Sequence, residues 1–324
     1  MKVAIIGAGA VGSACVTALV ARGCVHEIVI IDRTPVRALG LATDVQYGTV
    51  VLPPVIVRAG DFSDLKGVDL VAITAGVNEK TGGATDRNDT AGRLRLLDTN
   101  VDVYAGIIVK LHAIAPEALV IVVTDPPDPL ADATRMLGHT RVLSTGTYLD
   151  SLRFRFHLAR RLGVSPASVD ADVLGEHGTS EVFVWSSASV AGVPLAALPS
   201  WPADQSFDEF RSDIEHEVRY ANISIIEGIG ASQHGIGMVT ARIVEIIARD
   251  EKAVIPIGCY NPKYGVTLSL PSIVGRQGVI KIFEPELSAD ERDGLQRSAD
   301  TLKAALKRIK LPQNAPRSVQ ALSA

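Results

Sequence analysis

The segment "VLGEHGTSE" places His177 in a glycine-flanked loop directly after an apolar, strand-like run. An imidazole exchanges protons near neutral pH, so a histidine presented to a cleft can act as a general acid or base. Such a histidine needs a carboxylate to hold its tautomer and to stabilise its charged form. Taken alone, a histidine in this kind of loop is more often structural than catalytic.

A candidate partner lies in "GTYLDSLRFR", where Asp150 and Arg153 are three residues apart near the start of a predicted helix. This spacing puts both side chains on one face of the helix. If that face meets the His177 loop, Asp150 can orient the histidine and Arg153 can bind a substrate carboxylate through two parallel hydrogen bonds. The alternative is a surface salt bridge within the helix, which periodicity alone favours.

A second motif, "VAIIGAGAVGSA", indicates a dinucleotide site, because Gly7, Gly9 and Gly12 have G-x-G-x-x-G spacing between a strand and a helix. Twenty residues after Gly12, Asp32 ends the second predicted strand in "IVIIDR". A carboxylate there can accept both hydroxyls of an adenosine ribose and repels a 2′-phosphate, which favours NAD over NADP. Arg33 keeps NADP open, and a helix cap is the other interpretation of Asp32.

The apolar pattern predicts how these residues are positioned. Residues 1–145 alternate short apolar strands with helices, which predicts an α/β Rossmann domain with a doubly wound parallel sheet. Residues 146–324 have the character of an α+β substrate domain. That part includes a helix from roughly Phe207 to Ile229, with a kink expected near its glycines.

The composition narrows the possible partners. The chain has 324 residues, 47% of them hydrophobic, and a net charge of −4, so neither nucleic acid nor a membrane surface is an expected partner. Its three cysteines, Cys15, Cys24 and Cys259, are too few and scattered for a disulfide framework or a metal site. With no apolar run long enough for a span or a secretory signal, we expect a cytoplasmic protein.

Taken together, these motifs resemble the L-lactate/malate dehydrogenase family. "GAGAVG", Asp32, "TAG" at Thr74, Ala75 and Gly76, "LDSLRFR" and "GEHG" occur in the family's order and approximate spacing. The resemblance extends over nearly the whole chain. It implies that NAD is the cofactor, that Val11 and Thr74–Gly76 belong to its site, and that the protein is a homodimer or homotetramer.

The same resemblance implies a role for each site residue. His177 is the general acid–base, Asp150 its partner, Arg153 the carboxylate clamp, and Arg93 the residue that polarises the substrate carbonyl from a closing loop. Ser232, in "GASQHGIG", aligns with a residue of the substrate pocket. The loop carries extra residues around "GATDRNDTA", so Arg87 is the alternative to Arg93; the seven-residue step from Arg93 to Asn100 favours Arg93.

Two acidic residues depart from the family pattern. Glu79 aligns with the residue that contacts the substrate side chain, which is glutamine in lactate enzymes and arginine in malate enzymes. A carboxylate there disfavours oxaloacetate and can favour a polar or cationic side chain; a surface ion pair with Lys80 or Arg87 is the alternative. Asp125 replaces the asparagine that contacts the cofactor ribose and the substrate, and its charge can raise the pKa of His177.

The sequence therefore predicts an NAD-dependent L-2-hydroxy acid dehydrogenase of the lactate type, which transfers hydride reversibly between NADH and a 2-oxo acid. Malate dehydrogenase is one alternative, in which Arg87 would face the substrate. A non-catalytic NAD(H)-binding sensor with the same fold is the other. The sequence leaves open the physiological substrate, the direction of flux and the oligomer size.

Overall fold

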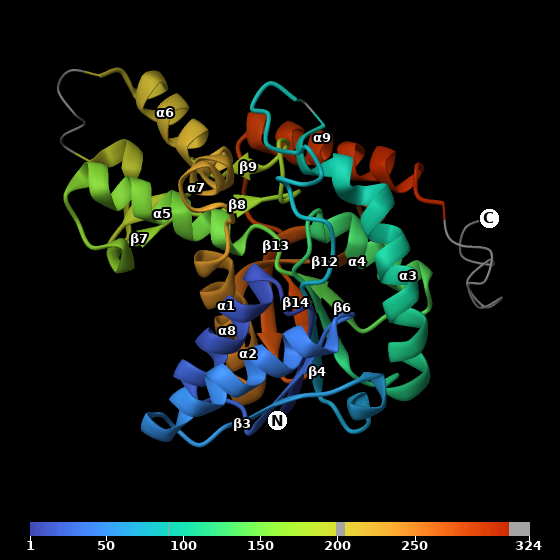
Figure 1. The fold of residues 1–324 in the computed structure, drawn as a ribbon. Coiled ribbons are helices and arrows are strands. Elements are labelled where there is room, and N and C mark those ends of the chain that lie inside the picture. The colour runs from blue at the N-terminus through green and yellow to red at the C-terminus, as the bar shows by residue number, and fades with distance from the viewer. Residues whose placement is uncertain (90, 199–204, 311–324) are drawn as a thin grey trace.

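The computed structural model describes residues 1–89, 91–198 and 205–310 (Figure 1). Within this part of the chain, the largest sheet has the strand order β14-β13-β12-β6-β5-β4-β1-β2-β3. Its parallel half consists of β1 (Lys2–Ile6), β2 (Glu27–Ile31), β3 (Ile56–Ala59), β4 (Leu70–Ile73), β5 (Leu119–Val122) and β6 (Val142–Ser144). The α/β fold class expected for residues 1–145, with its parallel sheet, is confirmed.

Both faces of the parallel half are covered by helices. Along β1, Ile5 packs on one face and Ala4 and Ile6 on the other, because successive strand residues point in opposite directions. The first face is covered by α1 (Ala10–Arg22), α2 (Pro35–Gly48) and α8 (His234–Arg249), and the second by α3 (Leu97–Ile114) and α4 (Pro127–Met136). This two-sided burial explains why the strands are continuous apolar runs.

The remaining strands extend this sheet or form small sheets beside it. Antiparallel β12 (Ala253–Asn261), β13 (Val266–Gly275) and β14 (Gly278–Ile282) join the main sheet, where Gly258 pairs with Ser144 of β6. Short strands form the small sheets: β7 (Val169–Asp170), β8 (Val173–Leu174), β9 (Val182–Phe183), β10 (Ser189–Val190) and β11 (Val193–Pro194). The main sheet and α8 therefore cross the predicted boundary at residue 145.

The upper part of the molecule in Figure 1 includes four helices that follow β6: α5 (Tyr148–Leu162), α6 (Phe207–Arg219), α7 (Ala221–Ile229) and α9 (Ala289–Leu306). The prediction of one helix from Phe207 to Ile229 with a kink near its glycines was wrong. The helix breaks at Tyr220, whose φ is −106° and ψ 11°, and Gly228 lies inside α7.

The break at Tyr220 has a packing reason. Phe210, Ile214 and Val218 of α6 are buried in a cluster with α5, whereas α7 buries Asn222 and Ile223 in other surroundings. One straight helix cannot direct its apolar stripe at two different surfaces. Among the described residues, no helix combines the length and apolarity that a membrane span requires.

Candidate active site

A cleft of about 970 Å³ runs along the carboxyl ends of β1, β2 and β4 and is lined by Gly7, Gly9, Asp32 and Thr74–Val77. Ligands of open parallel sheets bind at this edge, outside the strand ends. Thr74, Gly76 and Val77 also line a second, smaller pocket, so the two cavities are adjacent at these residues. The cleft thus leads to the region where the predicted catalytic residues lie.

The three glycines of the first motif have different surroundings. Gly7 has a φ of +113°, and a Cβ on Gly12 would lie 1.9 Å from the Gly7 carbonyl oxygen, so both positions require glycine for the fold itself. A Cβ on Gly9 would meet nothing within 4 Å. Gly9 precedes α1, whose first turn holds no acidic residue, so the open space lies at a helix end suited to a phosphate.

Asp32 is held by the backbone around the motif. Its two carboxylate oxygens accept hydrogen bonds from the Ala8 and Thr34 amides, each at 2.8 Å. Helix α2 has Thr34 as its N-cap, so Asp32 is not the N-cap residue of that helix. A carboxylate has about four lone-pair positions, which leaves capacity for ribose hydroxyls. The cleft, the glycines and Asp32 therefore fit a dinucleotide.

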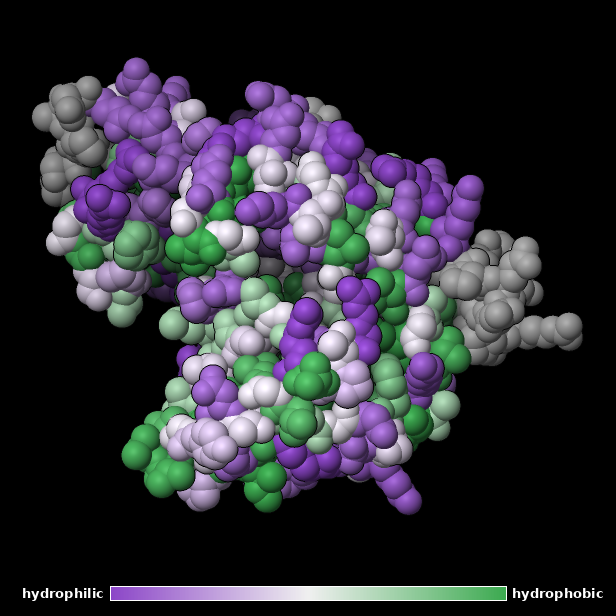
Figure 2. All heavy atoms as spheres, viewed as in Figure 1, coloured by the Kyte–Doolittle hydropathy of each residue, from purple (hydrophilic) through white to green (hydrophobic). Residues whose placement is uncertain are grey.

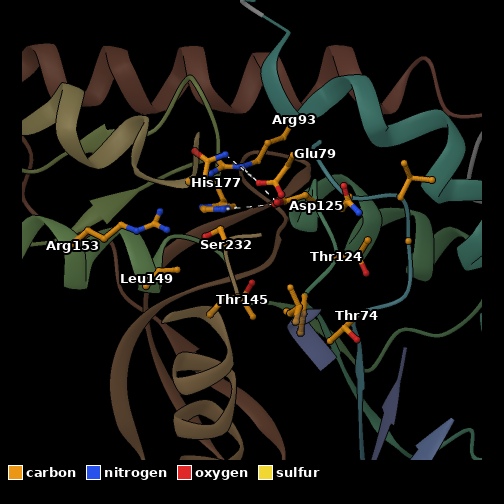
Figure 3. Close-up of a pocket in the computed structure, with 17 residues that line it drawn as sticks. Thr74, Glu79, Arg93, Thr124, Asp125, Thr145, Leu149, Arg153, His177 and Ser232 are labelled. Atoms are coloured by element: carbon orange, nitrogen blue, oxygen red, sulfur yellow. Dashed lines mark hydrogen bonds and ion pairs between the residues drawn. The ribbon is translucent and has the colours of Figure 1, made fainter. Parts of the chain in front are cut away.

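The smaller pocket brings most of the predicted catalytic and substrate residues together (Figure 3). Segments far apart in the chain line it: Val11 at the start of α1, Thr74 and Gly76 after β4, Asp125 after β5, Arg153 on α5, His177 after β8 and Ser232 before α8. Glu79 and Arg93 reach it from the two ends of the loop between β4 and α3. Ala75 lines the adjacent cofactor cleft instead.

His177, Asp150 and Arg153 form a connected group. The Nδ1 atom of His177 hydrogen-bonds to Oδ2 of Asp150, and Nη1 of Arg153 donates to Oδ1 of the same carboxylate at 3.0 Å. Burial works against the charged imidazole, but the Asp150 carboxylate outweighs it and raises the pKa of His177. Burial likewise opposes the Asp150 carboxylate, yet His177 and Arg153 hold its pKa below the usual range. The ring thus presents Nε2 toward the pocket.

A further carboxyl group, which sequence reasoning assigned no role, holds the His177 loop. Asp128 is fully buried, accepts the His177 backbone amide at 2.8 Å and also binds the Ser144 hydroxyl. Burial raises the pKa of Asp128 to about 7. Its position three residues after Asp125, inside "DPPDPL", is the only sequence signal that could have identified it.

The two departures from the family pattern, Glu79 and Asp125, both face the pocket. Nε of Arg93 lies 3.9 Å from Oε1 of Glu79 and 3.6 Å from Oδ2 of Asp125, and Oδ1 of Asp125 lies 3.7 Å from Nε2 of His177. Burial and the nearby Asp125 raise the pKa of Glu79, although Arg93 works in the opposite direction. The surface ion pair considered for Glu79 is not its environment.

The structure does not bring Arg87 into the pocket. Its guanidinium makes two hydrogen bonds to the Glu227 carboxylate on α7, at 2.7 and 2.8 Å, and one to Ser224 at 3.2 Å. This contact attaches the outer part of the loop to α7. Of the two arginines weighed from the sequence, only Arg93 lines the cavity.

Two asparagines support this loop and were not assigned a role from the sequence. Fully buried Asn100 of α3 accepts the Val77 amide at 2.7 Å and donates to the Asp125 carbonyl at 2.7 Å. Asn222 of α7 lines the pocket and donates to Oε1 of Glu79 at 3.1 Å. The role of Asn222 could not be predicted from the sequence, because it depends on where α7 packs.

Comparisons with known proteins agree with this architecture. Residues 1–142 match the model of the lactate/malate dehydrogenase NAD binding domain, and residues 147–311 match that of the alpha/beta C-terminal domain of the same family. The chain therefore belongs to the lactate/malate dehydrogenase family. Because the N-terminal match is an NAD-binding domain and the cleft fits a dinucleotide, the cofactor is NAD(H).

Individual relatives match along nearly their full length. L-lactate dehydrogenase of Thermus aquaticus is 42% identical over 94% of this chain and 98% of its own. L-lactate dehydrogenase of Chloroherpeton thalassium is 40% identical over 95% of this chain and 100% of its own. The crystal structure of the minor L-lactate dehydrogenase from Enterococcus mundtii superposes with a TM-score of 0.86 at 33% identity, covering 96% of this chain and 99% of that chain.

Proposed function

We propose that this protein is an NAD-dependent, lactate-type L-2-hydroxy acid dehydrogenase. The observation that carries the proposal is the convergence of His177, Asp150, Arg153 and Arg93 beside a dinucleotide cleft. Its full-length relatives named L-lactate dehydrogenase support the same conclusion. Each chemical requirement of the reaction has a group in the pocket to meet it.

Two guanidinium groups hold the 2-oxo acid. Arg153 binds the substrate carboxylate, since only one of its nitrogens is occupied by Asp150 and the planar group has five donors. Arg93 is buried, and its Nε has no hydrogen-bond partner within the described residues. We assign the Arg93 guanidinium to the carbonyl oxygen of the substrate, where it stabilises negative charge as the carbonyl is reduced.

His177 moves the proton. With Nδ1 bonded to Asp150, the proton given to the substrate oxygen leaves from Nε2, and in the reverse direction Nε2 accepts it. Asp150 is a positioning residue, which fixes the tautomer and stabilises the imidazolium. NAD(H), when bound by the Gly7–Gly12 turn and Asp32, supplies or accepts the hydride. Thr74–Gly76, Val11 and Asp125 line the junction between cofactor and substrate.

The two alternatives from the sequence have less support. Malate dehydrogenase would need a cation facing the second substrate carboxylate, but Arg87 binds Glu227 outside the pocket and Glu79 faces inward. A non-catalytic sensor has no need of the hydrogen-bonded group of His177, Asp150 and Arg153. The sensor therefore leaves the convergence of these three side chains unexplained.

The test is a steady-state assay of NADH oxidation with pyruvate and with branched, aromatic, cationic and dicarboxylic 2-oxo acids. We expect turnover with at least one monocarboxylic 2-oxo acid, and little with oxaloacetate. Tight NADH binding without turnover on any of them would support the sensor. A clear preference for oxaloacetate would support malate dehydrogenase.

We also propose that the chain forms a homodimer or homotetramer in the cytoplasm. Tyr47, Val50 and Val51, at the end of α2 and just after it, are 75%, 85% and 86% exposed, and Figure 2 shows apolar surface in that region. Contiguous apolar surface of this kind is typical of protein contacts. The three cysteines are free thiols, as is usual in a reducing compartment. Size-exclusion chromatography with light scattering measures the assembly.

A further inference from the structure

The reaction pocket has an acidic wall, formed by the carboxylates of Glu79 and Asp125. Glu79 comes from the loop after β4 and Asp125 from the segment after β5, and Figure 3 shows both side chains directed into the cavity. Their side chains are only 13% and 23% exposed. Two largely buried carboxylates facing one small cavity are costly unless something of opposite charge balances them.

The wall is held in place by neighbouring elements. Asn222 of α7, itself 5% exposed, donates to Oε1 of Glu79 at 3.1 Å, and the Glu79 carbonyl accepts the Ala84 amide at 2.8 Å. Asn100 of α3 fixes the Asp125 backbone through its carbonyl at 2.7 Å. Because residues of α7 and α3 hold Glu79 and the Asp125 backbone, the acidic wall is a fixed part of the pocket lining.

The protein's own cations balance this wall only in part, because Arg93 is shared between both carboxylates and His177 also pairs with Asp150. Among the described residues, two arginines line the pocket, Arg93 and Arg153. Arg153 is already bonded to Asp150 and has the substrate carboxylate to bind. Nε of Arg93 forms ion pairs with both wall carboxylates, at 3.9 and 3.6 Å, but hydrogen-bonds to neither. When the substrate carboxylate enters, it joins the two wall carboxylates and Asp150 as a fourth acid, whereas the cations are Arg93, Arg153 and protonated His177, so one negative charge stays uncompensated.

We infer that the natural substrate is an L-2-hydroxy acid, or its 2-oxo form, whose side chain ends in a positively charged ammonium or guanidinium group that pairs with the wall of Glu79 and Asp125. This inference rests on the proposed dehydrogenase function and adds a substrate class to it. An anionic side chain is repelled by the wall, and an apolar one desolvates the two carboxylates without adding a positive charge. A cationic side chain restores the charge balance of the closed pocket.

Protonation is the competing way to remove the charge. Burial and the proximity of Asp125 raise the pKa of Glu79, and a neutral Glu79 would instead donate a hydrogen bond and accept an uncharged side chain. A charged Glu79 favours a substrate with a cationic side chain, and a neutral Glu79 favours one with an uncharged side chain. Substrate preference, measured with molecules of equal shape and different charge, therefore decides between them.

The experiment measures kcat/KM for NAD-dependent oxidation of L-2-hydroxy acids of matched shape. The pairs are 2-hydroxy-6-aminohexanoate with 2-hydroxyheptanoate and 2-hydroxy-4-aminobutanoate with 2-hydroxypentanoate, and 2-hydroxyadipate is the anionic member. We expect at least one cationic acid to exceed its neutral partner by about tenfold or more, which corresponds to about 1.4 kcal/mol. Hydroxy acids are used because amino-substituted 2-oxo acids cyclise.

The matched variant is Glu79→Gln, which keeps the shape and removes the charge. It should lower the ratio of cationic to neutral kcat/KM by about tenfold, whereas Asp102→Asn, at an exposed position of α3, should leave the ratio unchanged. Preference for the neutral or anionic acids in the unmodified protein would overturn the inference and leave the dehydrogenase function standing. Oxidation of none of the acids would overturn both.

Discussion

The cofactor cleft and the reaction pocket are built in opposite ways. In the cleft, Gly7, Gly9 and Asp32 lie just outside the ends of consecutive elements, after β1, before α1 and after β2 respectively. In the pocket, the side chains come from separate loops and helices, with Asp125 and His177 more than fifty residues apart. The cleft is a local structure with a readable spacing, whereas the pocket depends on how distant elements pack.

This difference shows where the protein can vary. A glycine turn that must approach a pyrophosphate allows few substitutions, because a Cβ on Gly12 would lie 1.9 Å from a backbone oxygen. In the pocket, a neighbouring side chain holds one of the departures from the family pattern, because Asn222 hydrogen-bonds to Glu79. In the function that we propose, the group around His177 sets the reaction, and Glu79 and Asp125 set the substrate.

The largest effect should come from removing the proton-transfer group of the pocket while leaving the cleft intact. We expect His177→Asn to reduce kcat for 2-oxo acid reduction by about 10²- to 10⁴-fold, because general acid–base catalysis contributes about that much. NADH affinity, measured by fluorescence titration, should stay within about twofold of the unmodified protein. Near-normal turnover would contradict the assignment of His177.

Two glycine substitutions test whether the cleft binds the cofactor. We expect Gly9→Ala to weaken NADH binding by about tenfold or more with little change in Tm, because its Cβ enters open space reserved for the cofactor. Gly12→Ala should lower both Tm and NADH affinity, since its Cβ would collide with the Gly7 carbonyl. Equal losses of Tm in the two variants would show that Gly9 is structural.

The pH dependence of reduction should distinguish the effects of Asp150 and Asp125 on the pKa of His177. Reduction requires protonated His177, whose pKa is raised above 6.5, so kcat/KM for reduction should be full at acidic pH and should fall as pH rises through that raised pKa. Asp150→Asn removes the strongest cause of the increase and should move this fall to lower pH. Asp125→Asn should move it in the same direction by less. A profile unchanged in both variants would contradict this account.

The smallest effect should come from the outer attachment of the loop. Arg87 and Glu227 form an exposed ion pair, and such pairs contribute little, so we expect Arg87→Gln to raise the KM of the 2-oxo acid by about two- to fivefold with kcat largely retained. Glu227→Gln should do the same, and the double variant should be no worse than either. A loss of kcat comparable to that of His177→Asn would show that Arg87 acts in the pocket.

Sequence reasoning was most successful where structure is local. The parallel α/β half and its NAD-binding assignment follow from strand–helix alternation and glycine spacing, which act over a few tens of residues. The single helix expected from Phe207 to Ile229 failed because local propensity contains no signal for the break at Tyr220. That break depends on two different packing surfaces, which exist only after the chain has folded.

The sequence by itself determined the family, the cofactor motif and the set of charged side chains available for chemistry. Only the tertiary structure decided which of them meet: it placed Glu79 and Arg93 in the pocket, attached Arg87 to α7, and added Asn222 and Asp128 as supports. The physical reason is that a side chain's charge and its donors are intrinsic to the residue. Its partner and its burial are set by segments far away in the chain.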